Sequence, residues 1–462
     1  MKAPFSTLYE LCKNRITMLE LQGYELDRES LQKELDSIPE SFDEYIAFSK
    51  KLAPDKKRPD FHYTEPDSLE EIRSERPDGA RNRIPLQISE LELKDKTYGG
   101  VFGRFIGCML GKPLEVSWEM KNIRAYLEAV GAWELDDYLP QYSPAQRHPL
   151  RRDCAYSMKG LMSFAQPDDD INYTILGLRA LETYGAGFRS QDMIRLWLDS
   201  IPFTWTWGPE HSFYFTIATY LLNHGETLPD GEEWDALTRL FNSGEELIGA
   251  MIRADAFGLT NPGMTGKASE MAYRDGSMTH KKTGLYAEMW AAAVIAAAYT
   301  TFDPVTAIMA GLEQIPGNSR YAEALREALE ISLSESDWMS AYEKINSKWG
   351  YLGHAGTINE SAAIINALVH SVRKDGTVDI GRAVCITVMH GWDTDCSGAT
   401  AGCIAGVLCG KHNIPERWYK PLNDTYHSCV AGETDTSIGA LAERMYQMSR
   451  ILRQSSIQDC TE

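Results

Sequence analysis

The feature that most constrains this chain is a pair of carboxylates followed by glycines at every fourth position. The stretch HGWDTDCSGATAGCIAGVLCG, residues 390–410, contains Asp393 and Asp395 and then glycines at 398, 402, 406 and 410. This spacing places the glycines on one face of an α-helix. Each interior glycine weakens a helix by roughly 1 kcal/mol relative to alanine, so the pattern predicts that another backbone packs closely against this face.

A second stretch repeats this design. GGVFGRFIGCMLGKPLE, residues 99–115, has glycines at 99, 103, 107 and 111 and ends in Glu115. We expect the two glycine-faced helices to pack on each other. Both runs are too short to span a membrane, and residues 99–115 contain Arg104 and Lys112, so the spacing does not indicate a membrane helix pair.

Composition excludes several classes of function. The 462 residues include 46 Lys plus Arg against 66 Asp plus Glu, a formal net charge of −20. Such a chain repels a phosphate backbone, so we expect no nucleic-acid partner. The polar start and the lack of a long apolar run predict neither a signal peptide nor a membrane segment. Nine cysteines without a pairing pattern are typical of reduced thiols in the cytoplasm.

Helical periodicity dominates from Lys96 onward and two-residue alternation is scarce, which predicts an all-α fold. We divide the chain into an accessory helical extension with a linker, residues 1–95, and a compact multi-helix domain, residues 96–462. Within the extension, the charged and proline-rich residues 53–83 indicate a linker or a strap over the surface. The alanine-rich AEMWAAAVIAAAYTT is apolar nearly all round and is expected at the centre of the domain.

The predicted helices of the extension are short and lie near residues 7–22, 30–35 and 42–52. Those of the main domain are 98–111, 170–183, 191–200, 213–222, 235–249, 285–301, 303–314, 319–334, 337–348, 360–370, 380–390, 396–409 and 436–453.

A third acidic element lies between the two glycine-faced helices. Asp168, Asp169 and Asp170 stand together at the start of a predicted helix. One aspartate is enough to cap a helix, whereas three repel one another, and a bound divalent cation is the simplest compensation. A solvated acidic turn is the alternative here, and simple helix capping is the alternative for Asp393 and Asp395.

With Glu115, these residues make six carboxylates without imidazole or thiolate at the regular positions. Oxygen ligands of this kind favour Mg²⁺, Mn²⁺ or Ca²⁺, and six of them could hold two ions.

Three motifs carry a resemblance to a known family. They are the glycine helix that ends in GKPLE, the element DDDINYTILGLRALE, and GWDTDCSGATAGCIAGVLCGKHNIPERW. Over residues 96–450 the chain resembles the ADP-ribosylglycohydrolases, which include dinitrogenase reductase-activating glycohydrolase and the ADP-ribosyl-acceptor hydrolases. The resemblance implies an all-α dinuclear Mg²⁺ or Mn²⁺ hydrolase and makes residues 96–462 the catalytic domain.

The resemblance also implies roles for individual residues. Glu115 matches the acidic residue at the family's catalytic centre, and Glu115 and Asp169 are the expected catalytic pair. The expected metal ligands are Asp168, Asp169, Asp170, Asp393, Asp395 and Cys396.

Two of these positions depart from the family pattern. Asp168 stands where the family usually has threonine, and Cys396 where it has serine or threonine. A thiol is a poor ligand for Mg²⁺, so Ser397 or water is the alternative oxygen ligand. The departures indicate a subfamily whose substrate differs from ADP-ribosyl-arginine and ADP-ribosyl-serine.

Substrate contacts are expected from two further regions. Residues 253–288 place several basic and polar groups on predicted loops and helix starts, where local positive charge could receive a phosphate or diphosphate. A second group lies near the start of the predicted helix 360–370 and within the second metal motif. For each charged or polar residue, the alternative to substrate binding is ordinary surface charge. For Trp392, the alternative is packing against the glycine-faced helix. The expected substrate-binding residues are Arg274, His280, Tyr286, His354, Asn359 and Trp392.

The predicted function is metal-dependent cleavage at the anomeric carbon of an ADP-ribosyl or related ribosyl conjugate, either a small molecule or an ADP-ribosylated protein. Water would attack through an oxocarbenium-like transition state, with Glu115 as the first candidate for the acid/base role. The alternatives are a hydrolase of a nucleoside-like or other sugar conjugate, a catalytically silent structural or binding member of the family, and a two-metal phosphohydrolase. The oligomeric state is left open.

Overall fold

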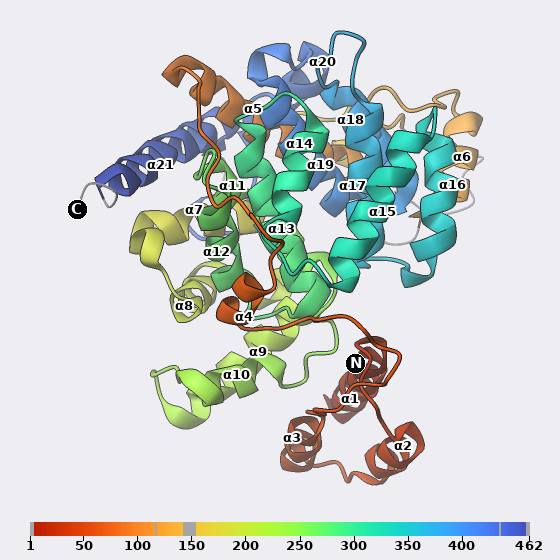
Figure 1. The fold of residues 1–462 in the computed structure, drawn as a ribbon, viewed down its shortest axis with the longest axis vertical. Coiled ribbons are helices and arrows are strands. Elements are labelled where there is room, and N and C mark those ends of the chain that lie inside the picture. Colours follow the sequence, from red (N-terminus) through yellow and green to blue (C-terminus); the bar gives the residue numbers. More distant parts are fainter. Residues whose placement is uncertain (1–3, 116–117, 142–153, 434–435, 459–462) are drawn as a thin grey trace.

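The computed structural model describes residues 4–115, 118–141, 154–433 and 436–458, and this part of the chain is predominantly helical (Figure 1). The all-α prediction is therefore confirmed. Within the same residues no helix is long and apolar enough to cross a membrane. The eight cysteines among them are free thiols.

The N-terminal helices are α1 (Pro4–Leu21), α2 (Arg28–Ser37), α3 (Phe42–Lys51) and α4 (Leu69–Ser74). The first half of the remaining chain contains α5 (Glu90–Gly111), α6 (Met120–Ala129), α7 (Asp169–Tyr184), α8 (Ser190–Ser200), α9 (Gly208–His224), α10 (Gly231–Arg239), α11 (Asp255–Leu259) and α12 (Thr265–Gly276). The second half contains α13 (Lys282–Ala298), α14 (Pro304–Leu312), α15 (Arg320–Ser334), α16 (Trp338–Trp349), α17 (Thr357–His370), α18 (Ile380–His390), α19 (Thr394–Cys409), α20 (Glu416–Tyr419) and α21 (Ile438–Gln458). The short strands are β1 (Trp118–Glu119), β2 (Gly391–Trp392), β3 (Thr425–Tyr426) and β4 (Thr436–Ser437), paired antiparallel as β1–β2 and β3–β4.

Helices α5 and α19 pack together through their glycines, as the four-residue spacing predicted. Gly103 and Gly402 face each other's backbone carbonyl groups, so the two helices touch without side chains between them. At one end of this antiparallel pair, Gly111 faces the carbonyl oxygen of Thr394. The end of α5 and the start of α19 are therefore side by side, and each of these ends adjoins an acidic motif.

The centre of the fold is α13. All seventeen residues of this helix are buried, and α11, α12, α14 and α19 pack around it. A helix surrounded in this way has no polar face, which explains its nearly uniform alanine-rich sequence. The predicted central position of this stretch is confirmed.

The N-terminal residues form two different structures. Helices α1–α3 lie together at the bottom of Figure 1 around a small apolar core of their own, into which Phe241 of the main body also packs. Residues 53–89 then run along the main body as a strap, and α4 belongs to it. The strap is tied down where Glu65 pairs with Arg320 at 2.7 Å and where the Ile84 amide donates to the Gly263 carbonyl at 2.7 Å.

Because of these contacts, residues 53–83 are a strap over the surface and not a free linker. The division at residue 95 falls inside α5, which begins at Glu90 after the capping side chain of Ser89. Whether residues 1–95 form an independent unit stays a prediction.

The helix prediction was wrong in three of its parts. The helix expected over 235–249 ends at Arg239, because the turn-forming residues Asn242, Ser243 and Gly244 follow and Phe241 has a positive φ of 56°. The segment assigned to loops before residue 282 contains α12, whose Ala268, Met271 and Ala272 are buried at helical spacing. Helix α6 was also missed.

Candidate active site and metal centre

The acidic motifs converge where the end of α5, the start of α7 and the start of α19 meet. Carboxylate oxygens of Glu115, Asp393 and Asp395 lie within 4.8 Å of one another. Carboxylate oxygens of Asp170 and Asp395 and the sulfur of Cys396 form a second group within the same 4.8 Å limit. Carboxylate oxygens of Asp168 and Asp170 and the sulfur of Cys108 form a third. The neighbouring carboxylates of Asp168, Asp170 and Asp395 raise the pKa of Asp169, in addition to the larger effect of burial. The structure thus brings together Glu115, Asp168, Asp169, Asp170, Asp393, Asp395 and Cys396.

Two buried cations neutralise part of this cluster. Lys112 Nζ lies 2.5 Å from Asp168 Oδ2, and Arg104 Nη2 lies 2.6 Å from Asp170 Oδ1. Asp168 also caps α7, because its Oδ1 accepts the Asp170 amide at 3.1 Å. Lysine and arginine therefore supply part of the compensation for the three aspartates that the sequence analysis assigned to a divalent cation. Asp168 therefore has a structural role in addition to any contact with a metal.

Glu360, in the first turn of α17, is a member of the cluster that sequence reasoning missed. Its Oε1 accepts the backbone amide of Asp393 at 2.9 Å. Its Oε2 is buried and has no hydrogen-bond partner among the described residues. An acidic residue in the first turn of a helix is ordinary, because it favours the helix dipole, so the position carried no signal of its own.

The electrostatics of the cluster fit a bound cation. Burial raises the pKa of Asp393 and of Glu360 well above the usual range, and the neighbouring carboxylate of Asp395 raises both further. Burial also raises the pKa of Asp170, although Arg104 opposes the shift. Like Glu360 Oε2, Asp170 Oδ2 is buried and has no hydrogen-bond partner among the described residues. Buried oxygens without donors are suitable ligands for a hard divalent ion.

The thiol of Cys396 is less suitable as a ligand. Burial, followed by the charge of Asp170, raises its pKa well above the usual range, so it remains a neutral thiol next to the carboxylates. A neutral thiol does not ligate Mg²⁺. The hydroxyl of Ser397, the alternative ligand, donates to the Asp393 carbonyl at 2.9 Å, which leaves its oxygen lone pairs available.

Three of the predicted substrate-binding residues adjoin the cluster. Trp392 lies in β2 immediately before Asp393 and pairs with Trp118 of β1; it is half-buried and has a φ of 72°. His354 has Asp395 and the Trp392 backbone as neighbours, and burial lowers its pKa. Asn359 Nδ2 donates to the Gly353 carbonyl at 2.9 Å and so stabilises the turn before α17.

The other three lie elsewhere. His280 is completely buried, with its ring 2.8 Å from the Thr279 hydroxyl, and Arg274 donates to the Ala186 carbonyl at 2.6 Å. Tyr286 donates to the carbonyl of Pro66 in the strap. The loop expectation for residues 253–288 fails because α12 and α13 bury most of this segment, so we do not carry these three residues into the proposed site.

Comparison with known proteins places the chain among its relatives. A family model described as ADP-ribosylglycohydrolase matches residues 89–454. Among matching solved structures, one titled "ADP-ribosylglycohydrolase-related protein complex" is 20% identical, with a TM-score of 0.46, and covers 78% of this chain and 99% of that chain. A comparison with curated proteins finds no match. Because the family model spans most of the chain, including every carboxylate of the cluster, the protein belongs to the ADP-ribosylglycohydrolase family.

Proposed function

We propose that the protein is a metal-dependent glycohydrolase that cleaves the bond at the anomeric carbon of an ADP-ribosyl or related ribosyl conjugate. Family membership implies glycohydrolase activity. The observation that carries the proposal is the convergence of Glu115, Asp393 and Asp395 within 4.8 Å at the end of the glycine-faced helix pair.

The cluster has enough negative charge for two divalent ions. The six carboxylates predicted from sequence are joined by Glu360 and by Asp255, whose Oδ2 lies 3.5 Å from Arg104 Nε. Among the described residues, Arg104 and Lys112 are the buried cations that pair with these eight carboxylates. If all were ionised, two Mg²⁺ or Mn²⁺ ions would still leave the site acidic. Asp169, Asp170, Asp393, Asp395 and Glu360 are the residues that would hold the ions. When bound, the ions supply Lewis-acid contacts for the vicinal hydroxyls of a ribose and lower the pKa of a coordinated water.

Burial distinguishes two carboxyls of the cluster from the others, and one of the two, Asp169, is also among the proposed ligands. Glu115 and Asp169 are half-buried, whereas Asp170, Asp393 and Asp395 are at most 5% exposed. Glu115 and Asp169 are therefore the carboxyls that a substrate can approach. We assign the proton transfer between the attacking water and the leaving group to these two residues, with Glu115 as the acid/base, while the buried carboxylates keep their positions.

The test is hydrolysis of a panel of ADP-ribosyl conjugates, nucleosides and ADP-ribosylated proteins with Mg²⁺, with Mn²⁺ and with EDTA. Metal-dependent release of free ribosyl product is expected, and Glu115→Gln and Asp393→Asn should each lower kcat at least a hundredfold. Asp375→Asn, which changes an exposed aspartate, is the matched control and should retain full activity. Release of inorganic phosphate in place of a ribosyl product would instead identify a phosphohydrolase. Absence of turnover together with absence of metal binding would favour a structural role.

A further inference from the structure

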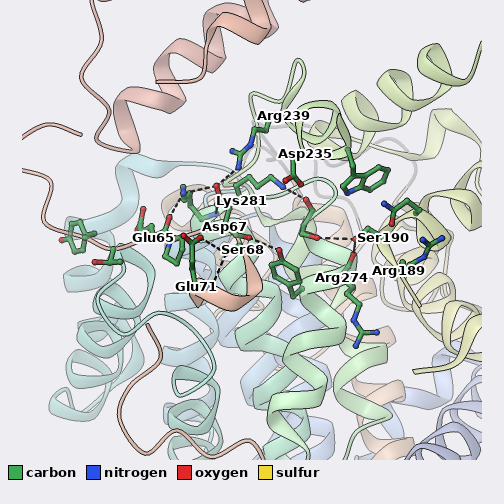
Figure 2. Close-up of a pocket in the computed structure, with 18 residues that line it drawn as sticks. Glu65, Asp67, Ser68, Glu71, Arg189, Ser190, Asp235, Arg239, Arg274 and Lys281 are labelled. Carbon is green, nitrogen blue, oxygen red and sulfur yellow. Dashed lines mark hydrogen bonds and ion pairs between the residues drawn. The ribbon is translucent and has the colours of Figure 1, made fainter. Parts of the chain in front are cut away.

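A second cleft lies apart from the carboxylate cluster. It has a volume of about 810 Å³ and is enclosed by strap residues 63–71 on one side and by α8, α10, α12 and the start of α13 on the other (Figure 2). None of the carboxylates of the metal centre lines it. The size is that of a site for a small organic ligand.

Three cations meet at the wall of this cleft and share one carboxylate. Lys282 Nζ lies 3.1 Å and Arg239 Nη2 lies 2.9 Å from the same oxygen of Asp67. Lys281 is only 4% exposed, and its Nζ donates to the Ser277 carbonyl at 2.5 Å. Among the residues that the structure describes, Lys281 forms no ion pair.

The other carboxylates at the cleft do not balance this charge. Glu65 is bound by Arg320 at 2.7 Å, and Glu71 and Asp235 are exposed to solvent at the rim. Burial, followed by the charge of Arg239, lowers the pKa of Lys281 to about 8. Asp67 attracts Lys281 as well as Lys282 and Arg239, and one carboxylate does not neutralise three cations. A chain of net charge −20 has no general need for such a local excess of positive charge.

We propose that this cleft is a second ligand site, which binds the phosphate group of a small molecule through Lys281 and Arg239. The phosphate supplies negative charge for three cations that have only Asp67 to share, among the residues that the structure describes at this wall. The remaining volume accommodates an organic portion beside Trp234 and Tyr273, which line the cleft. The site is independent of the proposed hydrolysis, because it uses no residue of the metal centre.

Titration calorimetry with inorganic phosphate, pyrophosphate and a sugar phosphate tests the proposal. EDTA is present throughout, so that metal at the acidic centre does not contribute, and chloride at matched ionic strength is the reference. Lys281→Gln should weaken binding at least about tenfold. The matched control is Lys348→Gln, which alters an exposed lysine paired with Glu327 and should bind as the unmodified protein does.

A second variant tests the site at an exposed residue, so that its folding is not affected by a change in the interior. Asp235→Asn removes an exposed negative charge from the rim and should tighten binding about two- to threefold. Equal affinity in the unmodified protein and in both cleft variants, or no saturable binding up to about 10 mM, would overturn the proposal.

A separate comparison distinguishes this site from the metal centre. Asp393→Asn should retain the full phosphate affinity, even though it should abolish hydrolysis. A clear preference for the sugar phosphate over inorganic phosphate would identify a phosphorylated metabolite as the ligand, whereas equal affinities would identify free phosphate. Loss of binding in Asp393→Asn would place the phosphate at the acidic centre and contradict a second site.

Discussion

At the scale of single residues, Glu360 connects the fold to the proposed metal centre. One oxygen accepts the Asp393 amide, and the other is buried and has no donor in the part of the chain that the structure describes. Groups that orient metal ligands typically change metal affinity by 10- to 100-fold when they are removed. Glu360 is therefore expected to act on metal binding, whether it ligates an ion directly or only positions Asp393.

We expect Glu360→Gln to weaken Mn²⁺ binding by about tenfold and Glu360→Ala by more. Glutamine still accepts the Asp393 amide but has lost the negative charge, whereas alanine loses both. Electron paramagnetic resonance of free Mn²⁺ measures the affinity without requiring turnover. Glu343→Gln on the exposed face of α16 is the control, and unchanged affinity in both Glu360 variants would contradict the assignment.

The buried pair of Lys112 and Asp168 is a second residue-scale case. Both side chains are 1% exposed, so removing one partner leaves an uncompensated charge in the interior. Lys112→Met should lower the free energy of unfolding by about 3 kcal/mol. The double variant Lys112→Met/Asp168→Asn should lose less than the two single changes added together, as urea unfolding would show. Strict additivity would mean that the pair is not coupled.

At the scale of elements, the packing of α5 against α19 sets the geometry of the site. The two acidic motifs lie at adjacent ends of these helices, so any separation of the helices moves Glu115 away from Asp393 and Asp395. Close contact requires glycine, since a Cβ at Gly107 would overlap the carbonyl of Gly398.

Gly107→Ala should therefore destabilise the protein by about 3 kcal/mol and also weaken metal binding. Both effects have the same origin, because the helices must move apart to accept the methyl group. Gly187→Ala is the matched control, since a Cβ there meets no atom within 4 Å, and its stability should change by less than about 0.5 kcal/mol. Thermal or urea unfolding of both variants makes the comparison, and equal stability would be inconsistent with the observed contact.

At the scale of the whole molecule, stability depends on buried groups that must stay in one charge state. His390 at the end of α18 is an example, because it is enclosed by aromatic rings and its Nε2 lies 2.8 Å from Asn366 Nδ2. Burial, followed by the charge of His370, lowers the pKa of His390 to about 3.

In the unfolded chain the pKa of this histidine returns to about 6.5. Between these two values the unfolded state binds the proton and the folded state does not, so acid favours unfolding. His390 should therefore cost about 1.4 kcal/mol of stability for each pH unit below about 6.5. Urea unfolding at pH 7.0 and 5.5 should show a smaller loss for His390→Gln than for the unmodified protein, whereas the exposed-site control His62→Gln should not differ. An equal loss of stability in all three proteins would contradict the lowered pKa of His390.

Much of the architecture was predictable because it follows from local geometry. Glycines four residues apart share a helix face whatever surrounds them, and an alanine-rich helix without a polar face must be buried. The helix pair, the central helix and the convergence of Glu115 with Asp393 and Asp395 could be anticipated on this basis. The error around residues 235–249 arose because apolar spacing outweighed the turn signal of Asn242 to Gly244.

The sequence by itself thus determined the fold class, the family and most of the acidic cluster. Only the tertiary structure decided which charges meet. Arg104 reaches Asp170 across 66 positions, Lys112 reaches Asp168 across 56, and Glu360 reaches Asp393 across 33. No local spacing encodes such contacts, because they depend on how whole helices are arranged. For the same reason, Lys281 was recognisable as a basic residue from its sequence, but only the folded chain shows that it is buried close to two further cations that share Asp67.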